Sequence, residues 1–572
     1  MSALLYPTLL FEFAVVLALL LVVAAVPRQA ARMLAAAETR LAILPTGLGK
    51  QLVLVAFAAI ALRAALLPWL GAPVPLIHDE HSLLLQARTF LEGRLANPTP
   101  ALWEYLQTFH VNLFPAYASV YFVGRGLPLV PGLLIAGEPW LGVWLVFVLL
   151  AMATVWMLRG YLGPRAALVG GLLVVLRLGA GSYWINSYWG GAFTALGAVL
   201  VVGSLGRILR RPRWSYGLLL GLGALILMTT RPYEGAVLCA ALGIFVLPRL
   251  FKSESVLLRQ AALRGGIPLL ACVAIGAGAT LAYNSATTGD PLLAPYEVNR
   301  AFYAEAPAFL MAAPIERDPR ALRTPAHFAS FYAAEAEPYR TARSSLVGLL
   351  GVSLLKLLFL WAFYIGPAMT LPFVAGLYAS RRDLPVVGTL AVLVAAHLLT
   401  TWDLPHYAAP VFPIVMILIM RGLVVLGRGP LTDRPAGYVL SRGSYLAAGA
   451  PLLLLLAHLT SGWPALPSNS WHLSCCAIAQ TSPRNEVLER LNAAPGRDLV
   501  LVENTRESPI HGEVVWNGPN IDDEPVIFAR SMDAEGDRRL IAEYGGRRIW
   551  RLRWIEGGYA LEPSSPAGAS AP

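Results

Sequence analysis

The sequence predicts an all-α polytopic membrane protein that ends in a small α/β domain. Of its 572 residues, 57% are hydrophobic and only 14% are charged, and the mean hydropathy is +0.60. A water-soluble chain of this length needs far more polar surface, whereas an apolar run of about 20 residues is enough to cross a bilayer as a helix. After residue 462 the apolar runs shorten, and Asp, Glu, Arg and Asn become common. We therefore expect a helical membrane body followed by a polar domain.

About twelve apolar runs, each bounded by charged or turn residues, predict membrane spans. They lie near 6–26, 51–70, 139–158, 166–184, 189–206, 215–230, 235–248, 267–285, 359–379, 385–402, 407–427 and 445–462. The first run is expected to stay as an uncleaved helix, because no A-x-A-type site precedes the basic segment after it. The segment 344–380 is too long for one span, and we expect its first part, with Lys356, to lie along the membrane or re-enter it.

Basic residues set the expected orientation. Lys and Arg gather in short loops on alternate sides of successive spans, and the positive-inside rule makes those loops cytoplasmic. The net charge of +10 is then a topology signal and not a nucleic-acid-binding face. The long loops 71–138 and 286–358 and everything after residue 463 are expected outside the cytoplasm.

Four regions follow from this organisation. Residues 1–50 hold a transmembrane helix and a cytoplasmic loop, 51–462 the main transmembrane domain, 463–562 an extracytoplasmic α/β domain, and 563–572 a disordered tail. Within the α/β domain, periodicity predicts helices at 486–491 and 534–544 and strands at 498–502, 525–529 and 547–554. Such a length suffices for a small domain.

The stretch from His78 to Asn112 concentrates ionisable side chains directly after an apolar span. Such groups at the mouth of a span are costly to bury unless they serve a reaction or a pathway. Leucines at helical spacing after the acidic pair predict an amphipathic helix along the membrane surface, with Gln86 among its polar residues and a stop at Gly93. Asp79 and Glu80 would start this helix, where its dipole favours the ionised form. An ionised Asp79 can act as a general base, and the alternative is that the pair only caps the helix.

A metal site is a second alternative for the same stretch. His78 and His81 are spaced i and i+3 and, with Asp79, could ligate a divalent cation. Cys239 and Cys272 lie in apolar spans and are expected to fill the core. Cys475 and Cys476 are adjacent, so a strained disulfide or a metal contact is open for them, although the other ligands of a usual spacing are absent.

Arg177 lies inside an apolar run, which costs about 2.5–3.5 kcal/mol on insertion scales and calls for a partner. It is expected either to pair with a carboxylate or reach the surface, or to bind a phosphate with its planar fork. The same choice applies to Arg231, which could simply pair with Glu234, and Trp189 lies in a turn that suits either the membrane interface or sugar stacking. The candidate substrate-binding residues are His78, His81, Trp103, Glu104, His110, Arg177, Trp189, Arg231, Glu234, Tyr296, Asn299, Arg300, His406 and Tyr407.

The layout resembles the GT-C glycosyltransferases, membrane enzymes that pass a sugar from a polyprenyl-phosphate donor to an extracytoplasmic acceptor. The likeness consists of an acidic motif in the first large outer loop, later outer loops and an outer C-terminal domain. The pair Asp79-Glu80 is similar to that of the protein mannosyltransferase and aminoarabinose transferase branch. One additional span before the acidic loop, the flanking histidines and the domain after residue 463 depart from it.

The resemblance implies a GT-C-like catalytic domain over 51–462, with Asp79 as general base and Glu80 holding the acceptor or a cation. Transfer would be an inverting single displacement, with Arg or Lys stabilising the leaving phosphate. No cofactor is implied with certainty beyond a possible divalent cation. The expected partners are the lipid-linked sugar donor, a lipid, glycan or protein acceptor, and membrane lipids, and the expected location is the inner (plasma) membrane.

Two other functions stay open at this stage. Twelve spans also suit a secondary transporter, although residues 1–230 and 231–462 show no convincing internal repeat. A transporter has little use for so large an outer loop or an outer domain. A non-catalytic envelope-glycan assembly protein, whose outer domain binds a polymer, is the third class.

Overall fold

The computed structural model describes residues 7–40, 44–251, 255–316, 318, 324–428, 434–462, 482–505, 508–509 and 512–564. Cys475, Cys476 and the end of the expected tail lie outside these residues. The chain forms two compact units, each described here by itself. Unit 1 comprises the described residues within Met1–Pro73, Val143–Gly276 and Ser353–Ile478, and unit 2 those within Val74–Gly142, Ala277–Val352 and Ala479–Pro572.

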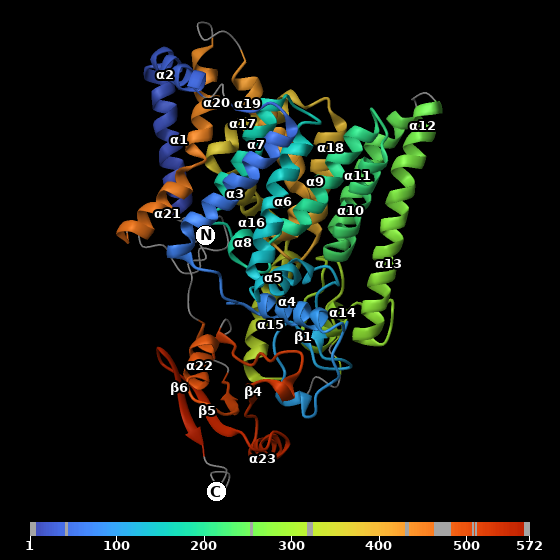
Figure 1. Ribbon diagram of the computed structural model, residues 1–572, viewed down its shortest axis with the longest axis vertical. Helices are drawn as coiled ribbons and strands as arrows, with labels where there is room; N and C mark the ends of the chain where they lie inside the picture. The colour runs from blue at the N-terminus through green and yellow to red at the C-terminus, as the bar shows by residue number, and fades with distance from the viewer. Residues whose placement is uncertain are drawn as a thin grey trace. The chain divides into compact units, whose positions relative to one another are not determined.

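Apolar helices make up unit 1 (Figure 1). They are α1 (Pro7–Ala25), α2 (Pro27–Arg40), α3 (Leu48–Leu70), α6 (Trp140–Leu158), α7 (Pro164–Leu178), α8 (Tyr183–Asn186), α9 (Ala192–Ile208), α10 (Trp214–Thr230), α11 (Pro232–Phe251), α12 (Ser255–Ala261), α17 (Gly366–Ala379), α18 (Leu384–Leu399), α19 (Phe412–Leu426), α20 (Pro435–Ala447) and α21 (Ala450–Ser461), with the 3₁₀ segment η8 (Pro405–Val411). Two more helices, α13 (Ile267–Thr288) and α16 (Leu346–Leu360), have residues in both units, as does α6, which begins in unit 2 at Trp140.

Each of the expected spans coincides with a helix. Among the described residues, seven helices are long and apolar enough to cross a membrane. They are Pro7–Ala25, Leu48–Leu70, Trp140–Leu158, Val256–Thr288, Leu346–Ala379, Pro405–Leu426 and Pro435–Ser461. Four of the shorter apolar helices, such as Ala192–Ile208 and Leu384–Leu399, match other expected spans. The prediction of an all-α polytopic membrane protein is therefore confirmed.

The segment after Ser344 differs from its prediction. α16 and α17 are joined by one π-helical turn, Trp361–Ile365, so the helical residues extend from Leu346 to Ala379 with non-helical backbone at Gly366. The turn ends at Gly366, whose φ of +65° suits glycine. Lys356 therefore lies within one long apolar helical segment and not in a separate surface piece.

Small residues bring helices of unit 1 close together. A Cβ on Gly376 of α17 would lie 1.8 Å from the carbonyl oxygen of Leu418 on α19, and one on Gly422 would lie 1.7 Å from that of Pro372. Close backbone approach at glycine is the usual packing device of membrane helices, where apolar burial alone gives little preference between protein and lipid. The pair α17 and α19 is thus fixed by sterics.

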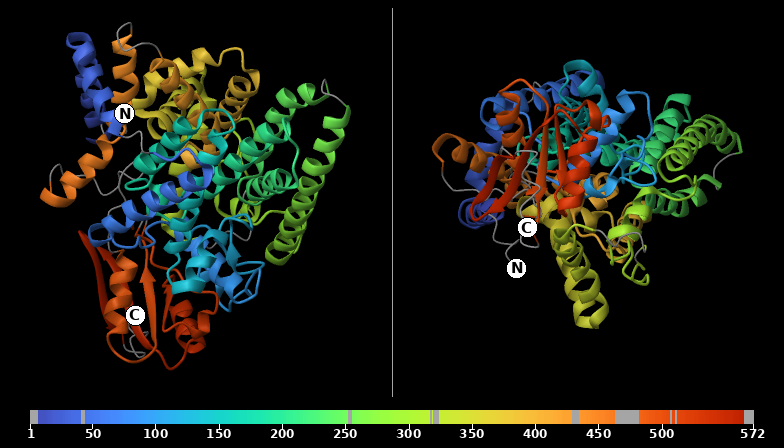
Figure 2. Two further views of the ribbon diagram at one scale, coloured as in Figure 1. Left: turned by 45° about the horizontal axis from the view of Figure 1, so that its top comes forward. Right: turned by 90° about the horizontal axis from the view of Figure 1, so that it is seen from below.

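Unit 2 joins the two long loops to the C-terminal segment. Its elements are α4 (His78–Leu91), β1 (Val111–Asn112), β2 (Ala118–Ser119), α5 (Val130–Ala136), α14 (Pro295–Tyr303), α15 (Ala326–Ser344), α22 (Pro483–Asn492), β3 (Asp498–Glu503), β4 (Val526–Arg530), α23 (Ala534–Glu543), β5 (Arg548–Ile555) and β6 (Gly558–Ser564). The larger sheet has the order β4-β3-β5-β6, with β3 parallel to β4 and β5, and β6 antiparallel to β5. Figure 2 shows this sheet and its helices in two views.

The two faces of this sheet pack against different parts of unit 2. Alternating residues of β3 divide between them: Val500 and Val502 pack with α22, whereas Leu499 and Leu501 pack with α23 and with aromatic residues of both loops. Those aromatic residues are Tyr105, Phe109, Phe302, Tyr303, Phe328 and Tyr332. The C-terminal segment and the loops therefore share one hydrophobic core.

The expected helices and three strands of the C-terminal segment are present, with ends shifted by one to three residues. Strand β6 was missed, and it runs through Ser564, so the first two residues of the expected disordered tail belong to the sheet. The helix α23 connects β4 to β5, which is the kind of crossover that parallel strands need.

Candidate active site

Helix α4 carries the acidic pair and begins where the sequence predicted. Glu80 caps it, since its Oε2 accepts hydrogen bonds from the backbone N–H groups of Leu76 at 2.8 Å and Ile77 at 3.2 Å. Gly93, with φ of +72°, follows its end. The buried carboxylate of Glu80 is thus engaged as a helix cap, which matches the alternative reading of the pair for this residue.

The expected polar face of α4 is only partly exposed: Arg88 and Glu92 are exposed, whereas Gln86 is buried. Ser82 and Gln86, on the face that follows Asp79 by helical spacing, are buried. Ser82 donates to the carbonyl oxygen of His110 at 2.6 Å, and Gln86 accepts from the N–H of Gly126 at 2.6 Å. These polar side chains are inside because the loop after α4 folds back over them and satisfies their hydrogen bonds.

Asp79 forms a three-residue cluster with His110 and Tyr121. The Tyr121 hydroxyl donates to Asp79 Oδ1, and it lies 3.2 Å from His110 Nδ1. The same Nδ1 is 3.6 Å from Asp79 Oδ2, and the side chains of Asp79 and His110 are each 18% exposed. The cluster is therefore partly accessible to solvent, and its three side chains are within reach of one another for proton exchange. Sequence reasoning named Asp79 and His110 but missed Tyr121.

A buried ion pair lies beside this cluster. Arg300 of α14 donates to Glu335 of α15 at 2.6 Å, and the two side chains are 7% and 14% exposed. Burial raises the pKa of the Glu335 carboxyl above its usual value, Arg300 opposes this, and the charges of His110 and Asp79 also act on it. Glu335 was not predicted. Its helical spacing from Phe328, Tyr332 and Tyr339 places a carboxylate on the buried, aromatic face of α15, and this pattern could have identified it.

The two histidines flanking the acidic pair point to aromatic neighbours. The ring of His81 stacks on Trp516 with centroids 4.7 Å apart, and burial lowers the pKa of His81 well below its usual value. The ring of His78 lies 4.3 Å from that of Phe109 and 5.7 Å from that of His110. In the described part of the chain, no group of three or more His, Cys, Asp or Glu side chains could hold a metal ion. The metal alternative for His78, Asp79 and His81 therefore has no matching geometry.

The remaining candidates of unit 2 belong to its packing. Trp103 contacts the rings of Phe114 and Phe302, and the backbone carbonyl of Glu104 accepts from Gln107 at 2.8 Å. Asn299 donates to Asn112 at 3.2 Å, and Tyr296 lies under the guanidinium of Arg300. These residues hold β1, α14 and α15 around the cluster.

A second group of candidates lies within unit 1. The guanidinium of Arg231 sits over the ring of Tyr407 at 4.1 Å, and the ring of His406 lies 4.3 Å from Tyr407 and 4.6 Å from Trp189. Arg231 Nε is buried without a hydrogen-bond partner in the described structure. No ion pair between Arg231 and Glu234 occurs among the described residues, so the expected pairing of these two is not what holds Arg231.

Two further ionisable groups of unit 1 accompany Arg231. Lys356 is fully buried and donates to the carbonyl oxygen of Thr400. His397 is 2% exposed, and both of its ring nitrogens lack a hydrogen-bond partner in the part of the chain that is described. It interacts electrostatically with Lys356 and Arg231. It lines, with Glu234, a cavity of ≈ 10 Å³. An imidazole that lacks a protein partner and lies near two cations is an arrangement suited to an anion.

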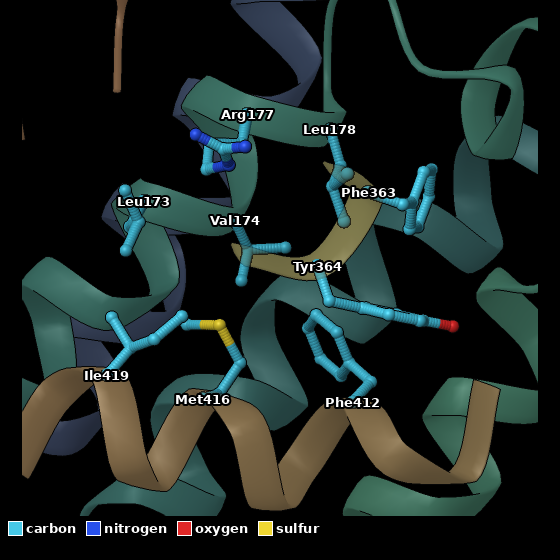
Figure 3. A pocket seen from close by; sticks show the side chains of 9 residues that line it. All are labelled: Leu173, Val174, Arg177, Leu178, Phe363, Tyr364, Phe412, Met416 and Ile419. Carbon is cyan, nitrogen blue, oxygen red and sulfur yellow. The ribbon is translucent and has the colours of Figure 1, made fainter. Parts of the chain in front are cut away.

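Arg177 has a carboxylate partner in the same unit. Its Nη1 donates to Glu12 Oε1 at 2.8 Å, and the two side chains are 8% and 2% exposed. Glu12 also accepts from the N–H of Ala368 at 2.9 Å. Arg177 lines a cavity of ≈ 20 Å³ between α7 and α19, among apolar side chains (Figure 3). Because Glu12 supplies the counter-charge of Arg177, the paired alternative describes this residue.

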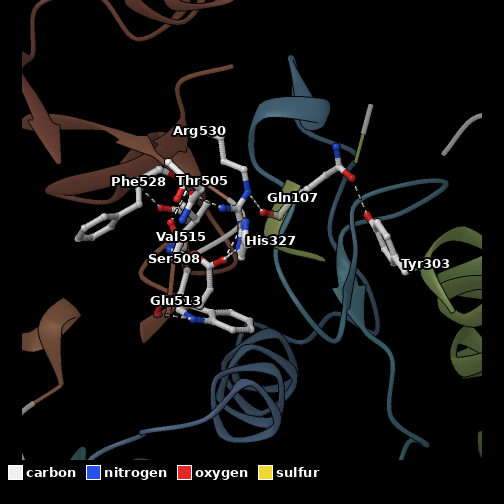
Figure 4. A network of polar contacts seen from close by, with 12 residues as sticks. Gln107, Tyr303, His327, Thr505, Ser508, Glu513, Val515, Phe528 and Arg530 are labelled. Carbon is white, nitrogen blue, oxygen red and sulfur yellow. Dashed lines mark hydrogen bonds and ion pairs between the residues drawn. The ribbon is translucent and has the colours of Figure 1, made fainter. Parts of the chain in front are cut away.

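A polar network ties the C-terminal segment to both loops of unit 2 (Figure 4). Glu513 Oε2 accepts from Arg530 at 2.6 Å and lies 3.0 Å from His327 Nε2. Arg530 also donates to the carbonyl oxygen of Gln107 at 2.7 Å. Gln107 in turn accepts from the Tyr303 hydroxyl at 2.9 Å. Gln107 lies three residues before His110, and His327 lies on α15. The network therefore fixes the loops that carry the cluster.

No protein-family model and no curated protein sequence matches this chain. Among solved structures it is similar to ArnT from Cupriavidus metallidurans in the apo state, at 12% identity and a TM-score of 0.49, over 91% of this chain and 97% of that one. It is similar to the apo oligosaccharyltransferase of Archaeoglobus fulgidus at 11% identity and a TM-score of 0.46, over 88% and 69%. For ArnT bound to undecaprenyl phosphate the values are 14%, 0.44, 91% and 98%. At such values the function has to be inferred from this chain's own residues.

Proposed function

We propose that this chain is a membrane glycosyltransferase that moves a sugar from a polyprenyl-phosphate donor to an extracytoplasmic lipid, glycan or protein acceptor. The observation that carries the proposal is the Asp79, His110 and Tyr121 cluster at the N-terminus of α4, in the first long loop after an apolar helix. An ionised carboxylate beside a partly exposed imidazole suits removal of a proton from an acceptor hydroxyl or amine. The resemblance of the sequence layout to GT-C enzymes agrees with this.

The chemistry needs a base and a stabilised leaving group. General-base assistance contributes about 10²–10⁴-fold to the rate. The leaving group is a lipid phosphate, which departs as an anion without a proton from an acid, and nearby cations lower its energy. A single displacement at the anomeric carbon then inverts its configuration.

We propose that Arg231 and Lys356, both in unit 1, bind the phosphate group of the donor lipid. Arg231 keeps its Nε without a hydrogen-bond partner among the described residues, and Tyr407 holds its guanidinium plane. Lys356 is a buried cation inside an apolar helical segment, which is costly unless it serves a function. His397 adds two further nitrogens without protein partners in the described residues. Arg177 is not part of this site, because Glu12 already neutralises it.

The function is tested with the purified full chain in detergent and a panel of undecaprenyl-phosphate hexoses and pentoses. Release of undecaprenyl phosphate together with a glycosylated product from an envelope extract is the expected result. Loss of this reaction in Asp79→Asn, with the protein still folded, ties it to the cluster. Passage of a labelled sugar across proteoliposomes without any new glycosidic bond would support a transporter instead.

A further inference from the structure

We propose that His110 receives the acceptor's proton and that Asp79 and Tyr121 position it. The inference rests on the proposed glycosyl transfer and differs from the sequence expectation, in which Asp79 itself is the base. The three residues have different roles. His110 Nε2 accepts the proton, the Asp79 carboxylate stabilises the positive charge that then forms on the imidazole, and Tyr121 fixes the orientation of the ring.

Hydrogen-bond donors and acceptors determine which nitrogen of His110 carries its proton. Tyr121 has one hydroxyl proton, and it is donated to Asp79 Oδ1, because an ionised carboxylate can only accept. The contact of 3.2 Å between Tyr121 and His110 Nδ1 then requires Nδ1–H to donate to the tyrosine oxygen. In a neutral imidazole the proton on Nδ1 leaves a lone pair on Nε2. His110 Nε2 has no hydrogen-bond partner among the described residues, and the side chain is 18% exposed.

Asp79 lies on the opposite side of the imidazole from Nε2. Its Oδ2 is 3.6 Å from Nδ1, a distance at which it stabilises an imidazolium once Nε2 is protonated. Its Oδ1 is already occupied by the Tyr121 hydroxyl, which makes Asp79 the less available proton acceptor. The arrangement of carboxylate, imidazole and free Nε2 is the one by which an acid residue orients a histidine base.

The backbone at His110 is held in an unusual conformation. Its φ of +58° is left-handed, which is uncommon for residues other than glycine. The carbonyl oxygen accepts from Ser82 Oγ at 2.6 Å and from the N–H of Val120 at 3.3 Å. Ser82 follows Asp79 by one helical turn, so α4 fixes both the carboxylate and the histidine. Strain that the surroundings maintain in this way is typical of functional positions.

The charged groups around His110 come from four elements. Asp79 lies on α4 and Tyr121 follows β2, Glu335 on α15 acts on the cluster electrostatically, and the ring of His78 meets that of His110 edge to face at 5.7 Å. Glu335 is itself paired with Arg300, which limits the charge it presents. A second guanidinium, that of Arg125, lies over the ring of Tyr121 at 5.7 Å from its centroid, so carboxylates and guanidinium groups both flank the cluster.

The step balances as follows. The acceptor oxygen or nitrogen bonds to the anomeric carbon while the bond from that carbon to the phosphate oxygen breaks, and the bonding electrons leave with the phosphate. The acceptor's proton moves to His110 Nε2. A singly charged phosphodiester becomes a doubly charged lipid phosphate, and the imidazolium formed beside Asp79 balances the additional charge. His110 returns its proton to water before the next turnover.

Imidazole rescue of His110→Gly in the full-length protein tests the assignment. Glycine adopts the left-handed backbone without strain and leaves room for free imidazole. Using undecaprenyl-phosphate hexoses and pentoses, we expect transfer to fall by roughly 10²-fold or more with donor binding unchanged. Added imidazole should restore the rate with saturation. His110→Asn, which also tolerates a positive φ, should be slow and should not be rescued, and it replaces the glycine variant if that one does not fold.

Asp79→Gly is the matched comparison, with formate as its added carboxylate. Imidazole should not rescue it, because its own imidazole is present but lacks a counter-charge. Transfer by His110→Gly at the unmutated rate, or rescue of Asp79→Gly by formate while His110→Gly does not respond to imidazole, would assign the proton to Asp79 and overturn the proposal. Absence of transfer by the unmutated chain from every donor is a different result, which removes the proposed function and this assignment together.

Discussion

Arg530 donates to Glu513 at 2.6 Å, and neither side chain is more than 2% exposed. A buried ion pair of this kind adds little net stability compared with an apolar pair, but removing one partner leaves a charge without compensation in the core. Because Arg530 also holds the backbone of Gln107, the pair couples the C-terminal strands to the loop that leads to His110.

Glu513→Gln is therefore expected to destabilise unit 2 by about 3–5 kcal/mol. Glu562→Gln is the matched control, since Glu562 pairs with Arg553 on the same sheet with both side chains more than half exposed, and exposed pairs contribute about 0–1 kcal/mol. Thermal unfolding of the full chain in detergent measures both variants. Equal midpoints for the two would show that the buried network does not stabilise the loops.

Acid should destabilise the same network in two stages. Burial lowers the pKa of His327 below its usual 6.5, so the unfolded chain binds that proton more readily and stability falls as the pH drops below 6.5. Burial alone raises the pKa of Glu513, but the Arg530 charge and the His327 hydrogen bond outweigh it and lower the pKa to about 2. Its contribution is present above about pH 4.5 and is lost as the pH falls toward 2. Melting points of the full chain from pH 7 to 3 should decline throughout, and Glu513→Gln should flatten the part below 4.5.

Arg177 and Glu12 should behave as a structural pair. Their contact of 2.8 Å is buried in the helical unit, so a double-mutant cycle with Arg177→Met and Glu12→Leu should give a coupling energy of about 0.5–3 kcal/mol. Donor-lipid binding by Arg177→Gln should equal that of the unmutated protein when the folded fraction is compared. Weaker donor binding by a variant of unchanged stability would show that Arg177 binds the donor's phosphate.

Arg231 and Lys356 should determine donor affinity. Arg231→Gln and Lys356→Gln are each expected to weaken binding of undecaprenyl phosphate by about 10-fold or more, because a charge-assisted hydrogen bond to phosphate contributes about 1.5–3 kcal/mol. Arg231→Lys should retain part of the affinity, since it keeps the charge but not the planar fork. Arg381→Gln, whose guanidinium lies over Tyr378 at a helix end, is a matched control for removal of a cation. Equal binding by all variants would contradict this site.

The fold was largely readable from the sequence. Helix α4, the apolar helices and the β3, β4 and β5 strands follow from local periodicity and capping, which depend on residues a few positions apart. The sequence placed Gln86 on an exposed face of α4, but its side chain is buried. Its burial depends on hydrogen bonds to Gly126 and Tyr283, which lie 40 and 197 residues away in the sequence. Burial of polar groups depends on contacts that no local pattern records.

The candidate site was predicted in part for the same reason. Asp79 and His110 were found because they lie in a stretch rich in ionisable groups. Tyr121 has no such signal in the sequence, and only the hairpin of β1 and β2 brings it to Asp79 on α4. The sequence left open whether Arg177 pairs with a carboxylate or binds a phosphate, because nothing in it identifies Glu12, 165 residues earlier, as the partner. Lys356 was expected in a surface or re-entrant piece, and His397 was overlooked, although an isolated ionisable residue in an apolar helix is itself a signal of intramembrane function.

The most direct test of the account is the turnover of Asp79→Asn in the purified full chain. The variant keeps the shape of the side chain but removes the charge beside His110, so transfer from undecaprenyl-phosphate sugars should fall by about 10²–10⁴-fold. Undecaprenyl-phosphate binding and the melting point should stay close to those of the unmutated protein. Transfer at the unmutated rate by folded Asp79→Asn would contradict the claim that this cluster is the catalytic centre.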